Sequence, residues 1–163
     1  MRGLQCSAEQ NPDLKQSIRS YSEFANLTFN EVYSKYDLSD AISLEATYFQ
    51  SAIFYNNKTS FTINALPNEN QVAPTNRSIT IKINGKNKII TVGNLYPVEV
   101  ETGRYDAHTG TVLSTDENKF SATPNTGLFN DKDARDLQLI TINGKKHLMV
   151  ANNRAQISFF EIL

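Results

Sequence analysis

The sequence predicts a mainly β protein with about two propeller-type antiparallel blades, that is, a partial β-propeller, and an N-terminal helical pair. Two recurrences support this prediction. An Asn-Gly-Lys tripeptide between two apolar runs occurs at Asn84 and again at Asn143, 59 positions later (143 − 84 = 59). A polar turn followed by phenylalanine recurs at the same offset, at Phe61 and Phe120. A unit of this length with four short strands has the size of a propeller blade.

Composition limits the classes of function. The chain has 163 residues, 39% of them hydrophobic, and a net charge of −1. It is long enough for one core, and it lacks the basic balance of a nucleic-acid-binding protein. No apolar run approaches the roughly 20 residues of a membrane span, and the first residues lack the apolar region of a signal peptide. For the single cysteine, Cys6, we weigh a lipid anchor against a free thiol on a frayed terminus, and we favour the thiol.

The pattern divides the chain into three parts. Residues 1–10 are expected to be disordered, residues 11–40 helical, and residues 41–163 a β-repeat domain.

The helical part contains two sets of capping signals. Asn11, followed by proline and aspartate, predicts a helix that continues to about Ala25. Thr28 and Glu31 form a capping-box pattern for a second, short helix that ends near Tyr36. We interpret the aromatic and aliphatic residues of this part as packing surface rather than a ligand site.

The remainder of the chain reads as hairpins. Residues 44–55 and 61–63 are expected to form one, and residues 110–113 and 120–122 a second that resembles it. The two Asn-Gly tripeptides join a further pair of hairpins, because this dipeptide tolerates the positive φ angles of tight turns. Residues 156–163 are predicted to form a final strand.

Several segments in order resemble the C-terminal end of the FG-GAP/VCBS repeat proteins, the integrin-α-like β-propellers. The resemblance covers about residues 44 to 160. The matching segments are Phe61–Pro67, Val92–Asn94, Val98–Ala107, Gly127–Phe129, Asp133–Leu137 and Ala151–Asn153. It implies a β-propeller, a location outside the cell or on its surface, and binding of a protein or glycan rather than catalysis.

The same resemblance raises the question of calcium, which the family often holds in Asp-x-Asp-x-Asp-Gly loops. The matching loops here start at Asn84 and Asn143, and lysines stand where a hard cation needs oxygen ligands. We therefore predict no metal in these loops and no cofactor. The family's export signal and earlier blades have no counterpart in the sequence, as in a partial gene product. We expect apolar surface where further propeller blades would dock.

Residues 95–109 form a long, chemically dense segment that supplies the candidate site. Its candidate ligand-binding residues are Glu99, Glu101, Arg104, Tyr105, Asp106 and His108. In a strand, the two glutamates would share one face while Val98 and Val100 pack inward. His147, outside this segment, is interpreted as a solvated strand residue without partner ligands for a metal.

Three interpretations of this segment remain open. Arg104 could hold a structural loop together through ion pairs with the acids, the loop could bind a ligand, or two carboxylates could act as acid and base in a carbohydrate-active enzyme. We predict a non-enzymatic binding module without catalytic residues. A glycosidase or lyase, and a purely structural blade, are the alternatives.

Overall fold

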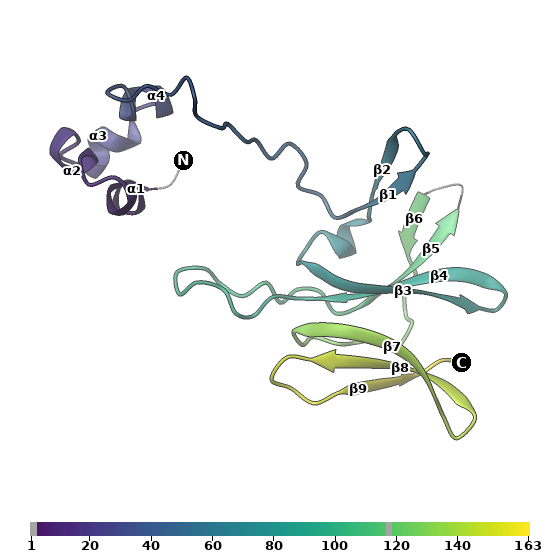
Figure 1. The fold of residues 1–163 in the computed structure, drawn as a ribbon. Coiled ribbons are helices and arrows are strands. Elements are labelled where there is room, and N and C mark those ends of the chain that lie inside the picture. The colour runs from purple at the N-terminus through teal and green to yellow at the C-terminus, as the bar shows by residue number, and fades with distance from the viewer. Residues whose placement is uncertain (1–2, 117–118) are drawn as a thin grey trace. The chain divides into compact units, whose positions relative to one another are not determined.

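The computed structural model describes residues 3–116 and 119–163 (Figure 1). The chain divides into two compact units, residues 1–46 and 47–163. The first unit is helical, and the second contains three antiparallel sheets of two, four and three strands. The predicted mainly β fold is therefore confirmed, while the propeller arrangement stays a prediction. No helix in the described ranges is long and apolar enough to cross a membrane.

The helical unit consists of four short helices. They are α1 (Leu4–Gln10), α2 (Leu14–Ser17), α3 (Tyr21–Ala25) and α4 (Phe29–Val32). The predicted capping box is confirmed, because the Glu31 amide donates to Thr28 Oγ1 at 3.4 Å and the Thr28 amide donates to Glu31 Oε2 at 2.7 Å. The helix that it caps ends at Val32, earlier than the predicted end near Tyr36.

Two predictions for this unit are wrong. Residues 4–10 are helical rather than disordered, because Ala8 is buried in the same small core as Leu14. The single helix expected from residue 11 to residue 25 is interrupted at Ile18, which has extended φ and ψ angles. Ser20 then caps a new helix by accepting a hydrogen bond from the Glu23 amide at 3.1 Å. This local Ser-x-x-Glu signal prevails over the apolar spacing that suggested one helix.

The β unit contains nine strands in its described residues. The two-stranded sheet holds β1 (Ala52–Asn56) and β2 (Phe61–Ala65). The four-stranded sheet holds β3 (Thr75–Ile83), β4 (Lys86–Gly93), β5 (Thr111–Asp116) and β6 (Lys119–Ala122). The three-stranded sheet holds β7 (Ala134–Ile142), β8 (Lys145–Asn152) and β9 (Ser158–Glu161).

The first hairpin starts later than predicted. Residues 44–51 are not part of a strand, and Leu44 and Phe49 are exposed. The β-branched and aromatic composition of this segment suggested a strand, but among the described residues the segment pairs with no other strand. In the second hairpin, the predicted turn includes residues 117 and 118, which lie outside the described residues.

The internal repeat is confirmed at the level of strand register. Ile83 pairs with Lys86 in the first Asn-Gly hairpin, and Ile142 pairs with Lys145 at the equivalent position of the second. Both turns place asparagine and glycine at positive φ, 50° and 76° in the first and 50° and 78° in the second. Each hairpin also has a register shift at the same place, after Thr75 and after Ala134.

The outer strands also pair in an equivalent register in the two repeats. Phe54 pairs with Ile63 in β1–β2, and the equivalent pair in β5–β6 is Leu113 with Ala122. Strand β9 is the counterpart of β5, because Phe159 pairs with Met149 as Val112 pairs with Ile90. The two repeats differ in the connection before these strands, which runs over residues 94–110 in the first and only 153–157 in the second.

One hydrophobic core joins the four-stranded and three-stranded sheets. Its buried members from β3, β4 and β5 pack against buried members from β7 and β8. They are Ile81, Ile90, Val92 and Val112 on one side and Ala134, Leu137, Leu148 and Val150 on the other. Burial of these side chains fixes the two sheets against each other and so positions the connection between β4 and β5.

Gly93, at the end of β4, provides a test of this packing. A β-carbon at this position would lie 1.9 Å from the Pro74 carbonyl oxygen. We expect Gly93→Ala to lower the free energy of unfolding by about 3 kcal/mol, at the upper end of typical overpacking costs, in urea denaturation. Gly103→Ala is the matched control, since a β-carbon there meets no other heavy atom within 4 Å. Equal losses in both variants would contradict the close approach.

Candidate functional site

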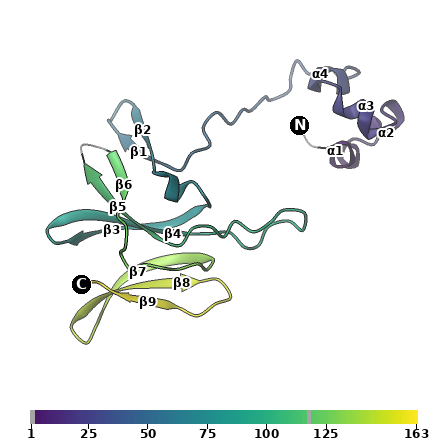
Figure 2. The same ribbon diagram turned by 180° about the vertical axis from the view of Figure 1, so that it is seen from behind.

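The connection between β4 and β5 is a protruding two-limbed loop, residues 94–110 (Figures 1 and 2). An isolated antiparallel bridge joins its limbs: the Leu95 amide donates to the Tyr105 carbonyl at 2.8 Å and the Tyr105 amide to the Leu95 carbonyl at 3.1 Å. At the tip, the Thr102 amide donates to the Glu99 carbonyl at 3.0 Å and the Thr102 hydroxyl to Glu99 Oε1 at 2.8 Å. The loop is therefore an ordered hairpin-like projection.

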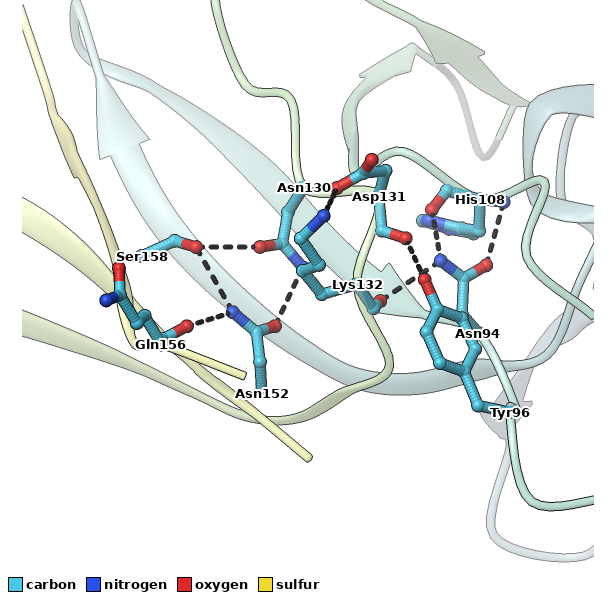
Figure 3. Close-up of polar contacts among 9 residues, drawn as sticks. All are labelled: Asn94, Tyr96, His108, Asn130, Asp131, Lys132, Asn152, Gln156 and Ser158. Carbon is cyan, nitrogen blue, oxygen red and sulfur yellow. Dashed lines mark hydrogen bonds and ion pairs between the residues drawn. The ribbon is translucent and has the colours of Figure 1, made fainter. Parts of the chain in front are cut away.

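Asn94 holds the root of this loop. It is fully buried and has a positive φ of 82°. Its Nδ2 donates to the carbonyls of His108 at 2.8 Å and Lys132 at 3.0 Å, and its Oδ1 accepts from the His108 amide at 2.9 Å (Figure 3). One side chain thus ties the start of the loop to its end and to the segment that leads into β7.

A second amide cluster continues from this root toward the three-stranded sheet (Figure 3). The Asn130 amide group donates to Asn152 Oδ1 at 3.0 Å, and Asn130 Oδ1 accepts from the Ser158 hydroxyl at 3.0 Å. Asn152 also donates to the Gln156 carbonyl at 2.8 Å. The Asn130 backbone amide reaches the Thr109 carbonyl at 2.7 Å, so the two clusters are connected.

His108 is buried beneath the loop with both ring nitrogens close to polar groups. Its Nδ1 accepts from the Gly110 amide at 3.0 Å, so the neutral ring carries its proton on Nε2. Nε2 lies 3.3 Å from Thr91 Oγ1 and 3.3 Å from Asn70 Nδ2. Burial lowers the pKa of His108 below its usual value, because the charged ring would lose its hydration.

Tyr96 makes two contacts that hold the limbs of the loop. The Tyr96 hydroxyl donates to the Asp131 carbonyl, which attaches the first limb to the same segment that Asn94 reaches (Figure 3). The Arg104 guanidinium carbon lies 4.9 Å from the centre of the Tyr96 ring, in cation–π geometry. Arg104 is therefore held by an aromatic face. Among the described residues it forms no ion pair with the loop acids, so the ion pairs of the structural interpretation are absent there.

The structure separates the six predicted site residues into two groups. His108 lies buried at the root, while Glu99, Glu101, Arg104, Tyr105 and Asp106 are exposed. Among the described residues, Glu101 and Asp106 have no hydrogen-bond or ion-pair partner.

The expectation that Val98 and Val100 pack inward from a strand is wrong for Val100. Residues 96–104 are not in a strand, and Val100 is fully exposed at the tip. The amide and tyrosine residues that anchor the loop, Asn94, Tyr96 and Asn130, were not among the predicted site residues. For Asn94 the sequence did contain a signal that could have identified it, because an asparagine ends both copies of the repeat, at Asn94 and Asn153.

No group of three or more histidine, cysteine, aspartate or glutamate residues that could hold a metal occurs in the part of the chain that the structure describes. A cleft of about 690 Å³ opens beside the core between the two larger sheets, and its walls are mostly apolar. Lys88 lines it and donates to Ser114 Oγ, which lies 2.8 Å from Thr123 Oγ1.

Comparison with protein-family models, curated proteins and solved structures finds no match to this chain. The internal repeat and the geometry of the loop therefore carry the proposal of its function.

Replacing Asn94 tests whether the amide root holds the loop. We expect Asn94→Ala to lower the free energy of unfolding by about 3 kcal/mol, because two carbonyls and one amide lose their buried partner. Asn125→Ala is the control: Asn125 also has a positive φ, 53°, but it is exposed and its side chain makes no hydrogen bond in the described structure. Thermal unfolding that affects both variants alike would show that the backbone angle, not the network, matters.

His108 predicts a pH dependence of stability. Its pKa is lowered from 6.5 in the folded chain, so below about pH 6.5 the unfolded chain binds a proton that the folded chain does not. The free energy of unfolding should therefore fall as pH decreases through 6.5, by at most about 1.4 kcal/mol per pH unit, and level off below the folded pKa. Urea denaturation at several pH values measures this slope.

The second histidine provides the control for that experiment. His108→Asn, which keeps an acceptor for the Gly110 amide, should abolish the slope, and His147→Gln should retain it. A slope that disappears with His147 instead would contradict the assignment to His108.

Proposed function

We propose that this chain is part of an FG-GAP/VCBS-like β-propeller repeat protein, a non-enzymatic module that binds a protein or glycan on the cell surface or outside the cell. Two features support the proposal. The hairpins recur with the same register and the same Asn-Gly turns, and the segments that resemble the family occur in the family's order. Further propeller blades would complete such a structure.

The observation that carries the binding function is the difference between the two repeats. Their strands pair alike, but residues 94–110 replace the short connection of residues 153–157. A structural repeat needs only the short form. The longer form is anchored by buried hydrogen bonds and carries its exposed groups away from the sheet, and loops on rigid sheets are common sites of recognition.

The exposed groups of the loop suit an interface. Val100 and Tyr105 offer apolar and aromatic surface, and Arg104 is pre-oriented on the Tyr96 ring. Aromatic residues and arginine are enriched among residues that dominate binding energy. Pre-orientation lowers the entropy that is lost when a ligand binds.

The same arrangement favours binding over acid–base catalysis. A general acid and base must converge on one substrate bond, usually in a site that excludes water. In this loop Glu101 and Asp106 are exposed and have no hydrogen-bond or ion-pair partner within the described ranges. His108 is buried at the root, with both ring nitrogens facing other groups.

The test uses the full chain on an immobilised array of defined glycans and on a displayed panel of extracellular protein domains. We expect the chain to bind one class of glycan or protein domain. The Arg104→Ala/Tyr105→Ala variant should bind that class more weakly by about 2 kcal/mol, roughly 30-fold, which is the loss typical of hot-spot residues. Lys86→Ala in the Asn-Gly turn is the control and should bind as the unaltered chain. Equal binding by the loop variant would contradict a site on the loop.

The two alternatives give different outcomes. If the chain cleaves a glycan and Glu101→Ala/Asp106→Ala abolishes that cleavage, the loop belongs to a carbohydrate-active enzyme. If no glycan or protein domain binds, the blade is purely structural.

A further inference from the structure

The repeat gives each sheet two distinct faces. The face of the four-stranded sheet that carries Ile90 and Val112 packs on the three-stranded sheet. Its opposite face carries Leu113, which lines a narrow space together with Ile53 of β1. The Phe120 ring of this opposite face stacks on the Tyr55 ring of β1, with centroids 6.4 Å apart. We call the face toward the next sheet in the chain the forward face, and the face toward the preceding sheet the rear face.

Forward and rear faces therefore meet twice within the chain. The forward face of β1–β2 meets the rear face of the four-stranded sheet, and the forward face of that sheet meets the rear face of the three-stranded sheet. The order of the three sheets can be followed in Figure 1. Because the strand registers are equivalent, the residues of each face can be assigned by position.

The forward face of the three-stranded sheet is apolar and partly open, since Ile142 and Phe159 are exposed and Ile140 and Met149 are half-buried. Its residues at the positions of Ile81, Ile83, Ile90 and Val112 are Ile140, Ile142, Met149 and Phe159. Val112 is 7% exposed in the first repeat, whereas its counterpart Phe159 is 51% exposed. The same type of surface is thus covered in one repeat and uncovered, within the described residues, in the next.

Among the described residues of the β unit, the rear face of β1–β2 is open in the same way. Phe54 stands at the position of Leu113, Phe61 at that of Phe120, and Ile63 at that of Ala122. Leu113 is 0% exposed, but Phe54 is 55% and Phe61 is 64% exposed. The Phe54 and Tyr48 rings meet in an edge-to-face arrangement, with centroids 6.4 Å apart.

We propose that two copies of this chain associate head to tail, with the forward face of the three-stranded sheet of one copy on the rear face of β1–β2 of the next. A forward face and a rear face already pack together twice within the chain, and one further face of each kind is exposed on the same molecule. Exposed apolar patches of this kind mark association surfaces. Since the two faces consist of different residues, the contact is heterologous and adds copies in one direction.

This association rests on the repeat character in the proposed function, because the second copy supplies the further sheets that a propeller-type array needs. It does not involve the loop of residues 94–110. Loss of ligand binding by the loop variants therefore leaves the association unchanged, and the two proposals fail separately.

The experiment measures the size of the full chain by sedimentation velocity from low to high protein concentration. We expect the unaltered chain to form dimers and larger species. Met149→Glu blocks the forward face and Phe54→Glu the rear face, so each variant alone should remain monomeric. Ser121→Glu, an exposed position of β6 outside both patches, adds the same charge and should associate like the unaltered chain.

Mixing the two blocked variants decides the geometry. Each retains one intact face, so an equimolar mixture should form a dimer that does not grow further. A monomer at every concentration of the unaltered chain, or a mixture that stays monomeric, would overturn the proposal. Dimers of Phe54→Glu alone would also overturn it, since they indicate a symmetric contact between forward faces. Phe159→Ser and Phe61→Ser, at two exposed positions, repeat the test with milder changes if a glutamate variant does not fold by circular dichroism.

Discussion

The β unit depends on satisfying the polar backbone where β4 ends, the long loop returns and β7 begins. All three segments come together in a buried region, and an unpaired buried carbonyl or amide there would cost about 1–3 kcal/mol. Asn94 meets this requirement with one side chain, through the carbonyls of His108 and Lys132 and the amide of His108. Its left-handed backbone conformation, which asparagine tolerates better than most residues, aims the side chain inward.

The same root explains how the loop can be both projecting and ordered. Asn94 and His108 close its base, the Leu95–Tyr105 bridge joins its limbs, and Tyr96 fixes one limb to the segment before β7. Little of the tip is buried, so its side chains are not required for folding. The tip residues can therefore differ without disturbing the sheets that form the repeat.

The sequence predicted the hairpins well and the boundaries of other elements poorly. Asn-Gly turns and the 59-residue offset act through local φ angles and pairing register, so the observed pairs follow directly. The predictions of a strand over residues 44–51 and of an inward-facing Val100 were wrong. Composition does not reveal whether a partner strand is present. For the site, five of the six candidate residues are exposed on one loop, but the anchor residues Tyr96 and Asn130 act through partners more than 20 positions away.

By itself, the sequence determined the mainly β character, the repeated hairpins and the location of the long loop, because these depend on turn chemistry, alternation and chain length. The tertiary structure decided which loop residues are available. It buried His108, stacked Arg104 on Tyr96 and exposed Val100. It also distinguished the covered face at Val112 from the open face at Phe159. Burial and contacts of this kind depend on which segments pack together, and the local sequence does not determine that packing.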